Sequence, residues 1–114
     1  MTRQRQQTGA AGEELAAQWY QRNGYSVVAR NWRCREGELD LVVARDRVIV
    51  FSEVKTRRSD RFGVPAEAVT ARKQRRLRVL AARFLREHPQ QARRIRFDVV
   101  AILGNEITVL EGAF

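Results

Sequence analysis

The stretch from residue 37 to residue 55 constrains the fold most, because it holds two strongly β-prone runs separated by a short polar break. Such a pattern predicts a β-hairpin. If the turn is centred on Asp46 and Arg47, antiparallel pairing places residues whose numbers sum to 93 opposite each other. Both faces of the hairpin carry apolar side chains, which is typical of strands in the middle of a covered sheet.

This register brings four charged side chains together on one face of the hairpin. Asp40 lies opposite Glu53, and Glu38 lies opposite Lys55. Directly opposed Cβ atoms are roughly 4.5–5.5 Å apart, so three carboxylates and one ammonium group share a small patch. Carboxylates in a covered sheet are costly unless a cation compensates them.

Each residue of this patch, taken alone, could have either an ordinary structural partner or a metal-binding role. Glu38 and Lys55 could form a cross-strand ion pair, and backbone donors or an arginine could satisfy Asp40 or Glu53. Adjacent like charges would nevertheless destabilise the sheet and raise a carboxylate pKa without a cation between them. We therefore interpret the patch as a divalent-metal site for Mg²⁺ or Mn²⁺, which prefer oxygen ligands.

Basic charge is concentrated in one part of the chain. Residues 54–96 hold 14 Lys and Arg against 3 Asp and Glu, whereas the whole chain has a net charge of +9. This asymmetry indicates a polyanionic partner, most often nucleic acid. A solubilising surface is the alternative.

The length of 114 residues fits one domain, with residues 1–8 expected to form a flexible basic N-terminus. Cys34 is the single cysteine, which favours a reducing compartment. No apolar run approaches the roughly 18 residues that span a bilayer, so we expect a cytoplasmic protein without a membrane partner.

The remaining elements follow from apolar periodicity and from Gly and Pro positions. We predict a helix over residues 10–23, a strand over 25–30, a basic loop over 56–65, a helix over 66–87 and strands over 95–103 and 106–110. The order is αβββαββ, which predicts an α/β sandwich.

Details of the two helices bear on the site. In the first helix, the predicted apolar stripe is Leu15, Ala16, Trp19 and Tyr20. Glu13 lies close to this stripe, although favourable first-turn charge would explain it equally. In the second helix, we expect Thr70 to act as an N-cap, while Arg72, Lys73 and Arg76 belong to a basic surface for phosphates or for solvent.

Asp40, followed after twelve residues by Glu53-Val54-Lys55, resembles the PD-(D/E)XK nuclease signature. The wider set of motifs resembles the YraN-like family of small uncharacterised bacterial proteins, which is similar to archaeal Holliday-junction resolvases. These motifs are Gly12-Glu13, Asn31, Gly37-Glu38-Leu39-Asp40-Leu41, Phe51, Lys73-Gln74 and Arg96-Phe97-Asp98-Val99-Val100. Leu39 departs from the superfamily signature, which has Pro at this position.

The resemblance implies a restriction-endonuclease-like α/β/α sandwich with a central mixed sheet. It also implies that Asp40, Glu53 and the backbone carbonyl of Val54 bind the metal, and that Lys55 acts on the attacking water. Glu13 would match the acid that many members place on the first helix.

Other site residues are expected in supporting roles. The resemblance implies that Glu38 is an accessory acid and that Lys73 and Gln74 reach the substrate phosphate. The full set of predicted nucleic-acid-binding residues is Arg57, Arg58, Arg61, Arg72, Lys73, Gln74 and Arg76.

We therefore expect a Mg²⁺-dependent (or Mn²⁺-dependent) DNA endonuclease that acts on branched or structured DNA, with a homodimer expected by analogy with resolvases. One alternative is a nucleic-acid-binding module without catalysis on the same scaffold. Another is a protein-interaction domain whose basic face meets an acidic partner.

Overall fold

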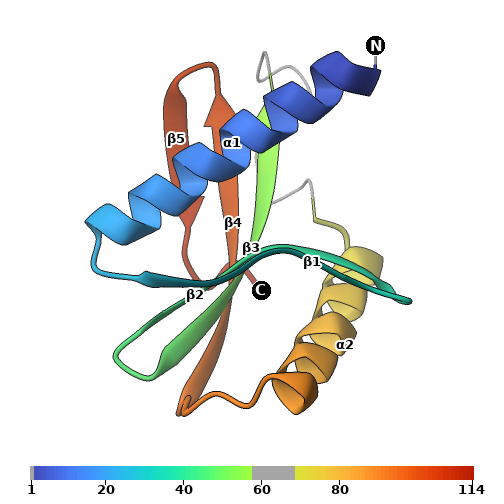
Figure 1. Cartoon of the computed structure of the whole chain (residues 1–114), viewed down its shortest axis with the longest axis vertical. Coiled ribbons are helices and arrows are strands. Elements are labelled where there is room, and N and C mark those ends of the chain that lie inside the picture. Colours follow the sequence, from blue (N-terminus) through green and yellow to red (C-terminus); the bar gives the residue numbers. More distant parts are fainter. Residues whose placement is uncertain (1, 58–68) are drawn as a thin grey trace.

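The computed structural model describes residues 2–57 and 69–114, with side chains described from residue 11 onward (Figure 1). Its elements are α1 (Thr2–Arg22), β1 (Ser26–Cys34), β2 (Gly37–Arg45), β3 (Val48–Arg57), α2 (Ala71–Glu87), β4 (Arg94–Leu103) and β5 (Glu106–Leu110). The predicted order αβββαββ is confirmed.

The five strands form one mixed sheet in the order β1-β2-β3-β4-β5. Only β3 and β4 are parallel among these pairs, and the other neighbours are antiparallel. Residues of α1 pack with one face of the sheet and residues of α2 with the other, which produces two separate buried clusters. The expected α/β sandwich with a central mixed sheet is confirmed, and it is consistent with a restriction-endonuclease-like fold.

The hairpin between β2 and β3 turns at Asp46 and Arg47 as predicted. Both residues have positive φ angles, of 51° and 64°, which is the conformation of the two-residue turns that match strand twist. The predicted register holds from Arg45–Val48 to Leu41–Ser52.

Pairing between β2 and β3 ends at Leu41–Ser52, whereas β2 continues to pair with β1 as far as Gly37. Leu39 lies in the cluster on the α2 side, and Leu41 lies in the cluster on the α1 side. A Cβ placed on Gly37 would meet the side chain of Leu80 in α2 at 3.4 Å. The tip of the β1–β2 hairpin therefore packs against α2, and β2 leaves β3 beyond Leu41. We call this opening the β2–β3 split.

Helix α1 begins earlier than the sequence pattern predicted. Residues 2–8, expected to be a flexible N-terminus, are helical. Arg and Gln are good helix formers, and the single Gly9 inside the helix costs only about 1 kcal/mol relative to Ala.

The face that α1 turns to the sheet consists of small side chains and one tyrosine. Ala16, Ala17 and Tyr20 are fully buried, whereas Leu15, predicted to be in the stripe, is 38% exposed. A Cβ on Gly12 would clash with Thr56 of β3, so the glycine allows the helix to approach the sheet closely. This approach carries the neighbouring Glu13 to the sheet.

Helix α2 has the predicted N-cap, because the Thr70 side chain accepts a hydrogen bond from the backbone N–H of Lys73. Its buried face consists of Leu77, Leu80, Ala81 and Phe84. Within residues 2–57 and 69–114, neither helix combines the length and apolar character that crossing a membrane requires.

Candidate active site

The β2–β3 split is occupied by the side chain of Asp40. Its Oδ2 accepts a hydrogen bond of 2.9 Å from the backbone N–H of Val54 in β3. The N–H and C=O of one residue in a strand point to the same side of that strand, so the Val54 carbonyl also faces the split. The role of that carbonyl as a metal ligand stays a prediction.

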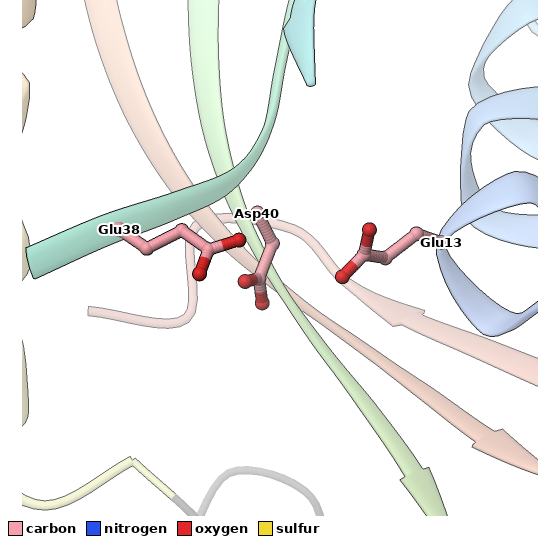
Figure 2. Close-up of side chains that lie close together, drawn as sticks. All are labelled: Glu13, Glu38 and Asp40. Carbon is pink, nitrogen blue, oxygen red and sulfur yellow. The ribbon is translucent and has the colours of Figure 1, made fainter. Parts of the chain in front are cut away.

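Three carboxylates converge beside the split (Figure 2). Glu38 and Asp40 come from β2 and Glu13 comes from α1, and one oxygen of each lies within 4.8 Å of the others. We call these residues the carboxylate triad. The triad draws on two separate elements, and the close approach of α1 to β3 at Gly12 brings the neighbouring Glu13 to the sheet.

The triad is electrostatically costly without a cation. Burial raises the pKa of Asp40 to about 7, and the negative charge of Glu53 adds to the increase, while the N–H of Val54 opposes it. Burial also raises the pKa of Glu13, against a hydrogen bond from Asn31 that lowers it. Protonation or a bound cation would relieve this repulsion.

Glu53 lies next to the triad but is held by two lysines. Its Oε1 is 2.5 Å from Nζ of Lys73 in α2 and 3.4 Å from Nζ of Lys55 in β3. The side chain of Glu53 is only 6% exposed, so both ammonium groups compensate a buried charge.

The two lysines have pKa values shifted in opposite directions. Burial, and then the neighbouring Lys73, lower the pKa of Lys55. Burial lowers the pKa of Lys73, but its hydrogen bonds to Glu53 and Lys55 and the nearby negative charges together outweigh this effect, so its pKa is raised. Lys55 therefore gives up a proton more readily than an ordinary lysine, while Lys73 remains charged.

One part of the predicted geometry is wrong. Neither predicted charged pair is part of the β2–β3 ladder, because the ladder ends at Leu41–Ser52. Asp40 is not paired with Glu53, and Glu38 is not paired with Lys55. Glu38 instead pairs with Arg33 of β1, its partner in the β1–β2 ladder, at 3.3 Å. The carboxylates still gather, but around the split and not on one face of a continuous hairpin.

The predicted nucleic-acid-binding residues are more widely separated than the acidic residues of the site. Arg72 and Arg76 are exposed on α2, whereas Arg57 is partly buried at the end of β3. Arg58 and Arg61 lie outside the described residues. The Gln74 amide donates to the backbone carbonyl of Val69 at 3.1 Å, so it braces the chain before α2.

Two contacts of the site were not predicted from the sequence. Asn31 supports Glu13, although it was noted only as part of a motif, and Lys73 binds Glu53 where a phosphate contact was expected. The sequence held a signal for the contact between Lys73 and Glu53. Lys73 stands in the first turn of the helix, where the partial positive charge of the helix dipole disfavours a cation, so a carboxylate partner is expected.

The donors around the split fit a small divalent cation. Carboxylate and backbone carbonyl oxygens are the ligands of Mg²⁺ and Mn²⁺, and one or two carboxylates are the usual protein contribution. The closely spaced oxygens of the carboxylate triad supply this chemistry, and burial raises the pKa of both Glu13 and Asp40. Asp40 is the centre of the set because it contacts β3 directly.

Sequence comparisons identify relatives of the chain. Residues 12–102 match the uncharacterised protein family UPF0102. A UPF0102 protein of Beutenbergia cavernae is 57% identical over 95 residues, covering 83% of this chain and 80% of the relative. A UPF0102 protein of Mycolicibacterium gilvum is 53% identical over 111 residues, covering 91% and 90% respectively.

The family match over residues 12–102 spans the triad, Glu53, Lys55 and α2, and so includes the whole site described above. The predicted YraN-like resemblance is confirmed, because UPF0102 is that family, a PD-(D/E)XK-like nuclease family. The chain belongs to the uncharacterised protein family UPF0102.

Proposed function

We propose that this protein is a divalent-metal-dependent DNA endonuclease that hydrolyses phosphodiester bonds, with branched or otherwise structured DNA as its substrate. The observation that carries the proposal is the convergence of Glu13, Glu38 and Asp40 within 4.8 Å beside a Glu-x-Lys strand. A purely structural role would not explain three adjacent carboxylates, because like charges in a partly buried site reduce stability.

In this proposal, Asp40 and Glu13 hold the metal together with the Val54 carbonyl, and Glu38 supports them. Glu53 joins these ligands when it is released from its lysines. A bound Mg²⁺ or Mn²⁺ would polarise the phosphoryl oxygen and stabilise the charge that develops during hydrolysis.

Lys55 is proposed to act at the reacting phosphate. Its ammonium is near Glu53, at 3.4 Å from Oε1, and burial lowers its pKa, which makes it a better proton donor than an ordinary lysine. It can hold the attacking water through one of its three donors and offset charge on the phosphate.

The basic surface supports DNA as the substrate. The chain carries a net charge of +9, and Lys73, Arg72 and Arg76 lie on the helix that borders the site. Such a surface binds phosphates without regard to sequence, which suits recognition of DNA shape. A homodimer on a two-fold symmetric junction stays a prediction by analogy.

A cleavage panel tests the proposal. Single-stranded, duplex, flapped and four-way junction DNA are incubated with the parent protein, Asp40→Ala and Glu53→Ala, in Mg²⁺, Mn²⁺ or EDTA. We expect the parent to cut at least one structured DNA only when a divalent cation is present, and both variants to be inactive. Cleavage that survives either substitution, or no cleavage of any DNA, would contradict it. Salt-dependent binding without cleavage would instead favour a non-catalytic binding module.

A further inference from the structure

Lys73 is placed where its helix does not favour a cation. It lies in the first turn of α2, which contains no acidic residue, and the helix dipole there is positive. A cation at such a position is unfavourable, so a contact outside the helix has to offset it. That contact is Glu53, whose Oε1 is 2.5 Å from Nζ of Lys73.

Glu53, the partner of Lys73, stands apart from the carboxylate triad. Among the described residues, the triad contains Glu13, Glu38 and Asp40, whereas Glu53 is absent from it. Glu53 is close enough that its charge raises the pKa of Asp40, yet its carboxylate is directed to the lysines on the α2 side of the sheet.

The same lysine is open to a second anion. The Lys73 side chain is 34% exposed, whereas that of Glu53 is 6% exposed, so an anion from solvent can approach Lys73. The side chain has several rotatable bonds beyond its capped backbone, so its ammonium group can turn to a new partner without movement of α2.

We propose that Lys73 is a positioning residue that holds Glu53 away from the carboxylate triad, and that a phosphate of the DNA draws Lys73 off Glu53 and releases Glu53 to the metal. This inference rests on the proposed function of the site. It makes binding of DNA and binding of the divalent cation mutually favourable, because each removes a competitor of the other. Full assembly of the metal ligands would then occur only on DNA.

Mn²⁺ binding without DNA gives the first test. Isothermal titration calorimetry compares the parent with Lys73→Met, which retains length but loses the charge. We expect Lys73→Met to bind Mn²⁺ about three- to tenfold more tightly, because Glu53 no longer has a competing cation from α2. Lys73→Arg retains the ion pair and should bind Mn²⁺ like the parent.

Arg75→Met is the matched control. Arg75 is exposed on the same helix and its loss removes the same charge, so it measures the general effect of one fewer cation. Its affinity for Mn²⁺ should stay within about twofold of the parent value. Thermal unfolding in EDTA checks that each variant is folded, and Lys73→Gln replaces Lys73→Met if the latter does not fold.

DNA binding gives the second test. The anisotropy of a fluorescent four-way junction reports DNA affinity with and without Mn²⁺. The ratio of the DNA affinity with Mn²⁺ to the DNA affinity without it should be larger for the parent and Arg75→Met than for Lys73→Met. The transfer of Lys73 from Glu53 to a DNA phosphate is lost only when Lys73 is removed.

The outcomes separate this inference from the proposed function. Equal or weaker Mn²⁺ binding by Lys73→Met, while the parent cuts DNA, overturns the inference alone. Tighter binding with the expected ratios, in a parent that cuts no DNA, supports the exchange and overturns the endonuclease. A parent that binds no Mn²⁺ overturns both.

Discussion

Two aspartates of the same sheet, Asp98 and Asp40, have opposite electrostatic surroundings. Asp98 in β4 is fully buried, and its oxygens accept hydrogen bonds from Arg96, from the Tyr20 hydroxyl at 2.7 Å and from the backbone N–H of Gly112 at 3.0 Å. Asp40 in β2 is less buried and receives one backbone N–H, from Val54. Its other close neighbours include two further carboxylates.

The difference separates an acid that holds the fold together from an acid available for chemistry. The Asp98 charge is compensated within the chain, so this network links α1, β4 and the C-terminal segment without needing a ligand. The Asp40 charge is opposed by its neighbours, which is typical of functional sites. The two can therefore be distinguished by isosteric substitution.

The largest expected effect is on cleavage by Asp40→Asn. The amide keeps an oxygen for the Val54 N–H but loses the negative charge that a metal requires. We expect the cleavage rate to fall by roughly a thousandfold or more, equivalent to about 4 kcal/mol of transition-state stabilisation. Single-turnover cleavage of the best substrate from the panel measures this rate. A loss below about tenfold would remove Asp40 from the centre of the site.

The second effect is on stability by Asp98→Asn. The amide group would direct N–H donors at Arg96 or Tyr20 and leave the guanidinium without its carboxylate. Breaking a buried ion pair in this way costs about 3–5 kcal/mol in the free energy of unfolding. Urea denaturation of the parent and the variant measures the change. A cost below about 1 kcal/mol would mean that the network is not a main support of the fold.

The sequence predicted the regular parts of this comparison. The two continuous apolar runs and the Asp46–Arg47 turn gave the register of the hairpin as far as Leu41, because the position of a tight turn fixes the pairing of its strands. The Thr70 cap followed from local chemistry as well. These features depend on residues close together in the chain.

The split and the two acid networks depend on contacts between distant elements. Beyond the point where β2 leaves β3, the hairpin tip lies against Leu80 of α2, and no local pattern encodes that contact. The sequence thus predicted that Asp40 and Glu53 lie in one region, but it did not predict which residues each of them contacts. One signal was present and unused, since Arg96 precedes Asp98 by two residues and so shares its face of β4.

The third effect is a pH dependence caused by Asp40. Its pKa rises from an unfolded value of about 3.8 to about 7 in the folded protein, so the folded state holds the proton more tightly. This group therefore lowers the free energy of unfolding as pH rises from about 4 to about 7.

Asp40→Asn stays neutral and should escape this loss. In EDTA at pH 8, it should be more stable than the parent by on the order of 2–4 kcal/mol, and the advantage should disappear near pH 4. Urea denaturation across this pH range measures the difference. Asp46→Asn in the exposed turn is the matched control and should show no such advantage. Equal pH profiles for Asp40→Asn and the parent would contradict the raised pKa.

The smallest effect is stabilisation by the cation itself. A ligand present at about ten times its Kd stabilises the folded state by roughly 1.4 kcal/mol, which for a domain of this size raises Tm by roughly 3–8 °C. Mn²⁺ at pH 8 should raise the Tm of the parent and of Asp46→Asn, but not that of Asp40→Asn, which has lost the central ligand. The rise should shrink toward pH 5, because protons then compete for Asp40. Differential scanning fluorimetry measures the shift. An equal rise in all three proteins would mean that Mn²⁺ binds elsewhere, and the contrast between Asp40 and Asp98 would then reflect tolerated strain in the sheet and not a metal site.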